Sequence, residues 1–133
     1  MTVGYSGTPL VRKLGIKPGH RVLVTGAPAG WALPPAPEAA VHTRAGREPY
    51  DVVLAFCADG TELRRRFAPA AGRITVAGAL WIAWPKRASG VATDLDENRV
   101  RDHGLEQGLV DVKVCAVDET WSGLKFVRRL RDR

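Results

Sequence analysis

Three runs of apolar residues divide the chain, and none of them alternates regularly with polar positions. They are RVLVTG at 21–26, YDVVLAFCAD at 50–59 and GALWIAWPK at 78–86. A strand that is apolar at successive positions is typical of a sheet covered on both faces, as parallel sheets are. The pattern therefore predicts three adjacent, buried and parallel strands.

The C-terminal part of the chain has the pattern of an antiparallel hairpin. Two strand-like stretches, VDVKVCAVD and LKFVRR, flank the segment ETWSG, and a glycine-containing loop of that length suits a hairpin. We expect the region from Lys113 to Arg129 to form an edge hairpin with Trp121 at its tip.

Polar residues that precede amphipathic stretches predict helices. Thr8 and Pro9 begin a short helix that Gly15 ends. Thr61 caps a second helix, ELRRRFAPAA, in which Leu63 and Phe67 face the sheet.

Asp94 and Glu97 have the spacing of a capping box and predict a third helix, which Gly104 ends. Prolines crowd the segment after the first apolar run, so little regular helix is expected from 32 to 37. The stretch AVHTR that follows is compatible with a short strand.

This order of elements predicts an α/β fold: a small Rossmann-like three-layer α/β/α domain with a mostly parallel central sheet and an antiparallel C-terminal hairpin. A chain of 133 residues is long enough for one core, so we assign residues 1–133 to a single Rossmann-like domain. The order resembles that of methyltransferase-like Rossmann folds, and VLVTGAPAG resembles their cofactor-binding turn.

Three departures from that pattern argue against a bound S-adenosylmethionine or NAD. Pro28 takes the place of a middle glycine, and Arg44 stands where an acidic residue would hold a ribose hydroxyl. Only about 25 residues separate Gly26 from Asp51, too few for the usual two helices and two strands. We therefore predict a truncated methyltransferase-like domain and assign it no cofactor.

Cysteine use and hydropathy place the chain inside the cell. Cys57 and Cys115 lie in apolar strand-like runs, so we interpret them as reduced, packed thiols rather than as a disulfide or a nucleophile. The start has no signal-peptide pattern, and no apolar run approaches the roughly 18 residues of a membrane span. We predict a cytoplasmic protein with no membrane partner.

The net charge of +6 suggests a nucleic-acid partner, but its distribution weakens that reading. Arginine outnumbers lysine 15 to 5, as in proteins from GC-rich genomes, so part of the charge reflects codon usage. Arg64, Arg65 and Arg66 are consecutive on the second predicted helix and point about 100° apart, which favours a solvated helix face. A nucleic-acid-associated basic protein is therefore a weaker alternative.

The polar residues form no catalytic or metal-binding pattern. His20, His42 and His103 lie in unrelated segments, and none stands at a motif spacing from a serine, a cysteine or an acidic pair. Asp118 and Glu119 would point to opposite faces of a strand. We name no catalytic and no metal residue, and an enzyme is the less favoured interpretation.

The candidate binding residues follow the apolar runs, at the carboxyl ends of the predicted strands, where open α/β sheets bind ligands. A lysine and an arginine there would donate to an anion, and a tryptophan would cover the crevice or anchor a partner. For each of these residues, packing or turn formation alone is the alternative. The ligand-binding hypothesis comprises Thr25, Gly26, Ala27, Gly30, Trp84, Lys86, Arg87, Ser89 and Trp121.

Longer stretches resemble the bacterial, actinobacterial-type family of domain of unknown function 3052. They are WPKRASGVATDLDENRV, GLVD, KVCAVDETWSGLKFV and the opening YSGTPLVRKLGIKPG, which together span nearly the whole chain. The resemblance implies a compact Rossmann-like domain. It implies no established activity, cofactor or catalytic residue.

These observations favour a non-catalytic binding or interaction module with an anion-binding crevice. The alternative is a minimal enzyme or a nucleotide-binding protein of degenerate, methyltransferase-like type. The partner is a small anionic ligand or a protein, and a homo-oligomer is compatible with the chain. The sequence identifies neither the ligand nor the oligomeric state.

Overall fold

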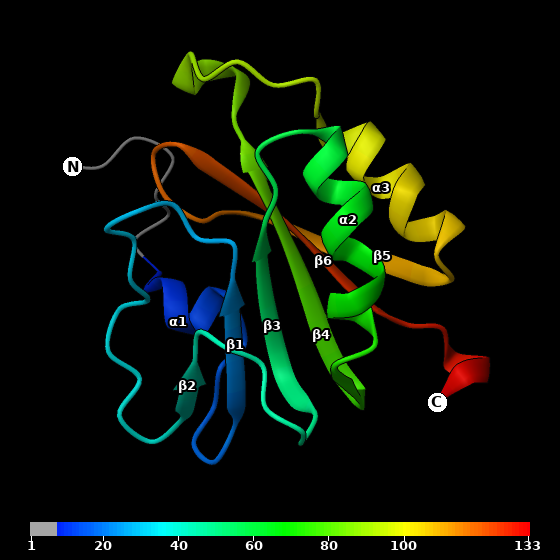
Figure 1. Ribbon diagram of the computed structural model, residues 1–133. Helices are drawn as coiled ribbons and strands as arrows, with labels where there is room; N and C mark the ends of the chain where they lie inside the picture. Colours follow the sequence, from blue (N-terminus) through cyan, green and yellow to red (C-terminus); the bar gives the residue numbers. More distant parts are fainter. Residues whose placement is uncertain (1–7) are drawn as a thin grey trace.

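The computed structural model describes residues 8–133, and its centre is a six-stranded sheet in the order β2-β1-β3-β4-β6-β5 (Figure 1). Its strands are β1 (Arg21–Thr25), β2 (Ala40–His42), β3 (Tyr50–Phe56), β4 (Ile74–Pro85), β5 (Leu109–Ala116) and β6 (Trp121–Arg128). Residues 5–7, which belong to the resembling N-terminal stretch, lie outside the described part.

The three apolar runs are adjacent parallel strands, as predicted. β3 pairs in parallel with β1 and with β4, and Val22 lies opposite Val52 while Leu54 lies opposite Trp81. All four of these side chains are buried. The AVHTR stretch forms β2, a parallel edge strand on β1. β5 and β6 form the antiparallel C-terminal hairpin, and β6 pairs with β4.

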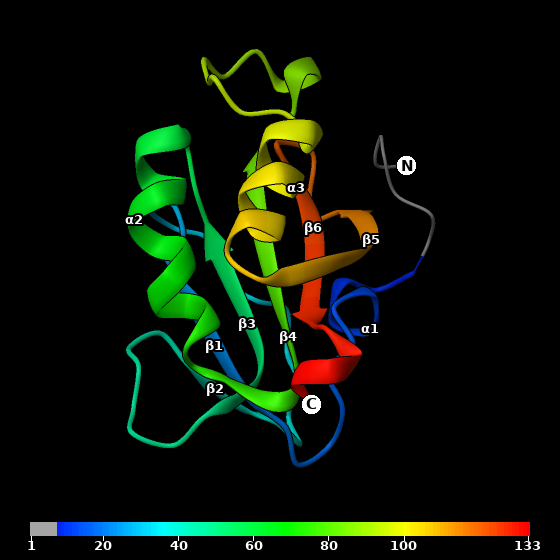
Figure 2. The same cartoon turned by 90° about the vertical axis from the view of Figure 1, so that its right-hand side faces the viewer.

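Helices cover one face of this sheet, and a thinner layer covers the other. The helices are α1 (Leu10–Lys13), α2 (Gly60–Ala71) and α3 (Glu97–Glu106), and 3₁₀ turns η1 (Arg87–Ser89) and η2 (Leu130–Asp132) follow β4 and β6. α2 and α3 pack on the first face, and α1 packs on the second together with the proline-rich segment 26–39. Figure 2 shows α1 and α2 on opposite sides of the sheet.

The α/β fold class is therefore confirmed, with one short helix and a loop as the third layer. Segment 26–49 contains a single element, the three-residue strand β2, which agrees with the predicted shortening. Within residues 8–133, no helix is long and apolar enough to cross a membrane.

The caps predicted for α2 and α3 are each displaced by two residues, and the N-cap position of α1 is Pro9 rather than the predicted Thr8. Asp59, not Thr61, caps α2, because Asp59 is extended and its carboxylate accepts the N–H of Glu62. Asp96, not Asp94, caps α3 by accepting the N–H of Arg99. At both helix starts two polar residues lie two positions apart in the sequence. The residue with an extended backbone directly before the helix, Asp59 or Asp96, is the cap.

Gly104 does not end the third helix, contrary to the prediction. α3 continues to Glu106, and the glycine with positive φ is Gly108. Gly104 is buried inside the helix, where an added Cβ would lie 2.0 Å from the Cε1 atom of Phe126. The glycine at this position allows α3 to approach β6 closely.

The hairpin turn lies at residues 117–120, before the predicted tip. Trp121 is already the first residue of β6 and lies opposite Pro85 of β4. Asp118 forms the turn, since its Oδ1 atom accepts the N–H groups of Thr120 and Trp121 at 2.8 Å each.

Candidate functional site

The chain changes direction across the sheet at β1, whose neighbours β2 and β3 both come later in the sequence. Ligands of open α/β sheets bind outside the carboxyl ends of strands at such a point. β1 ends at Thr25, and Gly26 follows with φ +72°, so the backbone turns sharply there as the sequence predicted. In a fold of this type, a ligand is therefore expected beside Gly26.

Arg66 of α2 fills this crevice. A Cβ on Gly26 would lie 2.7 Å from the Cζ atom of Arg66 and 2.8 Å from the carbonyl oxygen of Phe56. The Arg66 Nη1 atom donates to that carbonyl at 2.7 Å and to the Glu62 Oε1 atom at 2.7 Å. The guanidinium thus occupies the space in which closely spaced glycines would let a ligand approach β1.

Glu62 holds Arg66 in this position. Its Oε1 atom also accepts the N–H of Ala58 at 3.0 Å. That backbone hydrogen bond, followed by the bond and charge of Arg66, lowers the pKa of the Glu62 carboxyl against an opposing effect of burial. Glu62 is therefore the ionised partner of a charge-assisted hydrogen bond that fixes the guanidinium.

An aromatic cluster occupies the second face at the same edge. Phe56 is fully buried at the end of β3, with the ring of Trp31 at 4.7 Å and that of Trp121 at 5.0 Å, both edge-to-face. Trp31 also donates its indole N–H to the Oδ2 atom of Asp118 at 3.1 Å. The sequence predicted a role for Trp121 but missed Trp31, which Asp118 holds in this cluster, and Phe56, which β3 places there.

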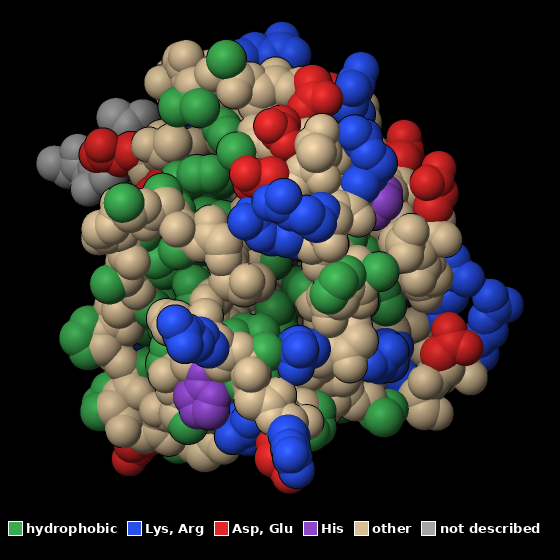
Figure 3. Space-filling view, in the orientation of Figure 1, with side chains coloured by type: hydrophobic (Ala, Val, Ile, Leu, Met, Phe, Trp, Pro, Cys, Tyr) green, Lys and Arg blue, Asp and Glu red, His purple; other side chains and the backbone are tan. Residues whose placement is uncertain are grey.

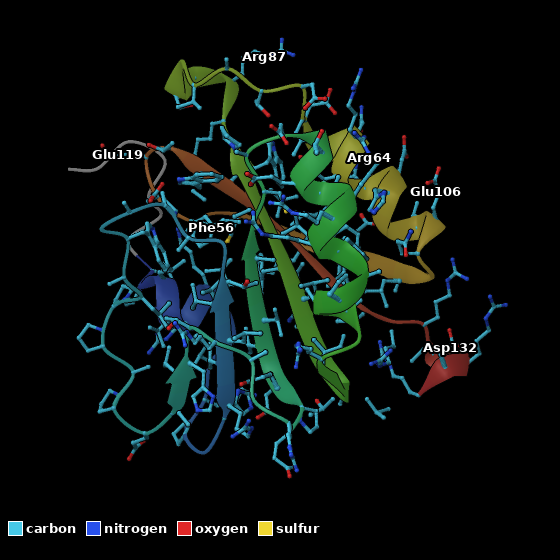
Figure 4. All side chains as sticks on the ribbon, viewed as in Figure 1. Phe56, Arg64, Arg87, Glu106, Glu119 and Asp132 are labelled. Atoms are coloured by element: carbon cyan, nitrogen blue, oxygen red, sulfur yellow. The ribbon has the colours of Figure 1, made fainter. Side chains whose placement is uncertain are left out.

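The predicted residues at the end of β4 lie apart from this cluster. Trp84 is buried on the face that α2 and α3 cover, and Lys86 follows it with its N–H donated to the Thr120 carbonyl. Figure 4 places Arg87 on the loop beyond β4, well separated from Phe56. Ser89 Oγ donates to the Lys86 carbonyl at 2.6 Å and accepts the N–H of Val91, so it stabilises the η1 turn.

Arg87 and Thr25 line different cavities. The cavity at Arg87 has a volume of about 350 Å³, and its lining includes Asp94, Asp96 and Arg99. Two carboxylates on its wall offset the two guanidinium groups. Ala27 packs against the cluster of the second face, and Gly30 closes a tight turn at φ +79°.

Thr25 lines a cavity of about 260 Å³ that lies between β1 and α2. Its other lining residues are Leu23, Ala45, Arg65, Arg66, Pro69, Ala70 and Arg73. Three guanidinium groups therefore gather at one cavity, and no acidic side chain is among its lining residues. From sequence, Arg65 and Arg66 were expected on a solvated helix face. The signal that it missed is their place in the first two turns of a helix that follows the strand next to β1.

The three histidines have structural contacts, and a buried cysteine has a raised pKa. His20 accepts the N–H of Lys17, His42 contacts the Tyr50 hydroxyl at 2.9 Å, and His103 packs edge-on against Phe67. Burial raises the pKa of the Cys57 thiol to about 12. Among residues 8–133 no group of three or more histidine, cysteine, aspartate or glutamate side chains could hold a metal ion.

No protein-family model matches the chain, and no curated protein sequence matches it. Solved structures of similar fold include methyltransferases and a methylase. The ribosomal protein L11 methylase of Lactobacillus delbrueckii subsp. bulgaricus has a TM-score of 0.58 and 12% identity, over 90% of this chain and 75% of that one.

Two further methyltransferase structures have a similar fold. A TehB-like methyltransferase from Corynebacterium glutamicum has a TM-score of 0.59 and 10% identity, over 90% of this chain and 85% of that one. The magnesium protoporphyrin IX methyltransferase of Synechocystis, solved with bound S-adenosylmethionine, has a TM-score of 0.59 and 14% identity, over 90% and 74%. The chain therefore has a methyltransferase-like Rossmann fold.

Proposed function

We propose that this chain is a non-catalytic binding module on a methyltransferase-like fold, and that its ligand is a small anion. The observation that carries this proposal is the position of Arg66, whose guanidinium fills the crevice beside Gly26. We further propose that the chain belongs to the family of domain of unknown function 3052, on the residues that resemble it.

An adenosyl cofactor beside Gly26 would have to displace a guanidinium that makes two hydrogen bonds of 2.7 Å. Displacement would break the partly exposed ion pair with Glu62 and would leave the carbonyl of the buried Phe56 without this donor, and an unpaired polar group at a buried site costs about 1–3 kcal/mol. Segment 26–49 provides only β2 where two helices and two strands would be usual. Both features oppose the use of this crevice for S-adenosylmethionine.

The cations near the carboxyl edge support an anion instead. Arg65 and Arg66 lie on the wall of the β1–α2 cavity, and Lys86 and Arg87 follow β4. Arginine is suited to such a ligand because its planar guanidinium donates two parallel hydrogen bonds to one oxyanion. The site residues predicted from sequence stay a proposal at this edge, with Thr25 on the β1 side and Lys86 and Arg87 on the β4 side.

The alternative function is that of a degenerate methyltransferase or nucleotide-binding protein, which the fold of the similar structures favours. Calorimetric titration of the protein with S-adenosylmethionine separates the two. We expect no heat of binding at millimolar cofactor, whereas sodium phosphate should raise the melting temperature in a saturable way. A dissociation constant for S-adenosylmethionine in the micromolar range would contradict the proposal.

Arg66→Ala tests the reason for this expectation, and Arg64→Ala is its matched control. Arg64 is exposed on the same helix and makes a local hydrogen bond of 3.4 Å to the Thr61 hydroxyl. If only the filled crevice excludes the cofactor, Arg66→Ala should gain weak S-adenosylmethionine binding and Arg64→Ala should not. If neither variant binds, the short segment 26–49 is the stronger obstacle, and the absence of cofactor binding still holds.

A further inference from the structure

The cavity between β1 and α2 is open to solvent on the face of the molecule shown in Figure 3. Segment 43–49 crosses in front of β1 on its way from β2 to β3, and α2 lies beside it (Figure 1). Ala45 of that segment and Pro69 of α2 both line the cavity, and Leu23 and Thr25 of β1 form its floor. In Figure 3 the surface is hollowed at this place, with Lys and Arg side chains around it.

Three arginines surround the cavity with hydrogen-bond donors that the fold does not use. Arg66 bonds through Nη1 alone, and Arg73 makes one bond of 3.1 Å from its Nη1 to the Gly46 carbonyl. Arg65 makes no side-chain hydrogen bond or ion pair within residues 8–133. A guanidinium has five N–H donors, so most of the donor capacity at this cavity is free.

The charge balance at this place is uneven. Glu62 offsets part of the charge of Arg66 through their ion pair, while Arg65 and Arg73 lie on the cavity wall with no carboxylate among the lining residues. Segment 43–49 adds Arg44 and Arg47 and one acid, Glu48, all exposed. Clustered cations repel one another, so the folded protein gains stability when an anion binds among them.

The remaining wall of the cavity is apolar. Leu23, Ala45, Pro69 and Ala70 offer carbon surface next to the guanidinium groups, and the Thr25 hydroxyl is half-buried among them. A volume of about 260 Å³ lies just below the range of about 300–1,000 Å³ that is usual for small-molecule pockets, so the cavity suits only a small ligand. A lining that combines cationic donors with carbon surface suits a molecule with an anionic group and a compact body.

We infer that the cavity lined by Thr25, Arg65, Arg66 and Arg73 binds the phosphate group of a small phosphomonoester. A phosphate has oxygens in three directions and a charge near −2, which suits three guanidinium groups better than a planar carboxylate does. The inference rests on the proposed function, because it locates the anion site and names the class of its ligand. It places that site on the side of β1 that faces α2, away from Lys86 and Arg87.

Calorimetric titration with ribose 5-phosphate and with inorganic phosphate, at low and at physiological salt, tests the inference. We expect Arg65→Gln to weaken phosphate binding about tenfold or more, since a charge-assisted hydrogen bond is lost. Arg64→Gln is the matched control, because Arg64 is the neighbouring residue and lines a different cavity with Asp102 and His103. It should leave the dissociation constant within about twofold of wild type, the range expected for a change in overall charge alone.

The two probes distinguish the sources of the phosphate. Tighter binding of ribose 5-phosphate identifies an organic phosphate as the ligand, and the inference then stands in full. Equal binding of both probes overturns the organic part of the inference. Equal losses in Arg65→Gln and Arg64→Gln overturn the site, because they show a general effect of charge.

A second pair of variants separates this inference from the proposed function. If Lys86→Ala and Arg87→Ala abolish phosphate binding while Arg65→Gln does not, the protein is an anion-binding module with its site at the end of β4, and the inference is wrong. If no phosphate binds to the wild-type protein at millimolar concentration, the proposed function itself fails. Circular dichroism of each variant confirms that the fold is retained, which is expected because Arg65, Lys86 and Arg87 are partly or fully exposed.

Discussion

Replacing Gly104 with alanine tests how closely α3 packs on β6. In an exposed helix interior this change stabilises by about 1 kcal/mol, because alanine has the higher helix propensity. Here the new Cβ would lie 2.0, 2.5 and 2.7 Å from three ring atoms of Phe126. A carbon–carbon contact needs about 3.5–4.0 Å, so the helix and the ring must separate by more than 1 Å.

Phe126 cannot move away easily. It is fully buried, and the ring of Phe67 packs against it edge-to-face at 5.3 Å. Overpacking of a filled core costs about 1–3 kcal/mol, and a required separation of more than 1 Å puts this contact near the upper end of that range, above the gain of about 1 kcal/mol in helix propensity. We expect a net loss of about 2 kcal/mol in the free energy of unfolding, or a decrease of about 6 °C in the melting temperature for a domain of this size.

Urea unfolding followed by circular dichroism measures this loss, and two variants control it. Gly72→Ala should be nearly neutral, because a Cβ on Gly72 would lie 3.6 Å from the carbonyl oxygens of Ala68 and Pro69, an ordinary contact, and its φ of −68° suits alanine. Phe126→Leu shortens the ring side chain, so Gly104→Ala should cost less in that background than alone. A stabilising effect of Gly104→Ala in the wild-type background would refute the close approach of α3 and β6.

Three further predictions concern single side chains. Thiol reagents at pH 8 should modify Cys57 only when the protein unfolds and Cys115 more readily, because Cys57 is fully buried and Cys115 is half-buried. Since burial raises the pKa of Cys57 from 9.0 to about 12, its contribution to stability is present below pH 9 and is lost as the pH rises toward 12; Cys57→Ala should weaken this alkaline loss in unfolding titrations. The pKa of Glu62 is lowered, so its contribution is present above its ordinary pKa of 4.5 and is lost as the pH falls through the lowered value; an acid limb of stability that is unchanged in Glu62→Gln would contradict this assignment.

The sheet could be predicted from sequence because its central strands are apolar at successive positions. The same pattern could not indicate which face each side chain occupies. Trp81 and Trp84 are both buried, yet Trp81 lies with the core cluster of α1 and Trp84 with that of α2 and α3. A run without alternation contains no information about direction, so Trp84 was placed in the candidate crevice although it lies in the core.

Glycines were a second source of error, for a different physical reason. Gly26 and Gly30 were assigned correctly to turns, and both have positive φ. Gly104 was assigned to a helix end, but it is a contact between two elements that are more than twenty residues apart in the chain. The sequence near a glycine can indicate a local turn. The ring that occupies the space of a side chain at position 104 belongs to β6, so the residues near Gly104 give no sign of it.

The position of Arg66 could not be predicted either, because it depends on the strand order and on the helix start together. Asp59 caps α2, so the Arg66 side chain lies on the side of the helix that faces β1. Since β1 is the neighbour of β3, the guanidinium then reaches the turn at Gly26. A sequence pattern can indicate the turn and the helix separately. It cannot indicate that a side chain of the helix lies against the turn.

The shortness of segment 26–49 accounts both for the position of Arg66 beside Gly26 and for the open cavity next to it. With only β2 in this segment, α2 is the helix nearest to β1 on its face of the sheet, and Arg66 can extend across to Gly26. For the same reason no helix lies over Leu23 and Thr25 on the far side of α2, and Ala45 of an irregular segment forms the other wall of the cavity. One shortening of the chain therefore brings Arg66 against Gly26 and leaves an arginine-lined cavity next to it, which is why we propose binding there and not at the usual crevice.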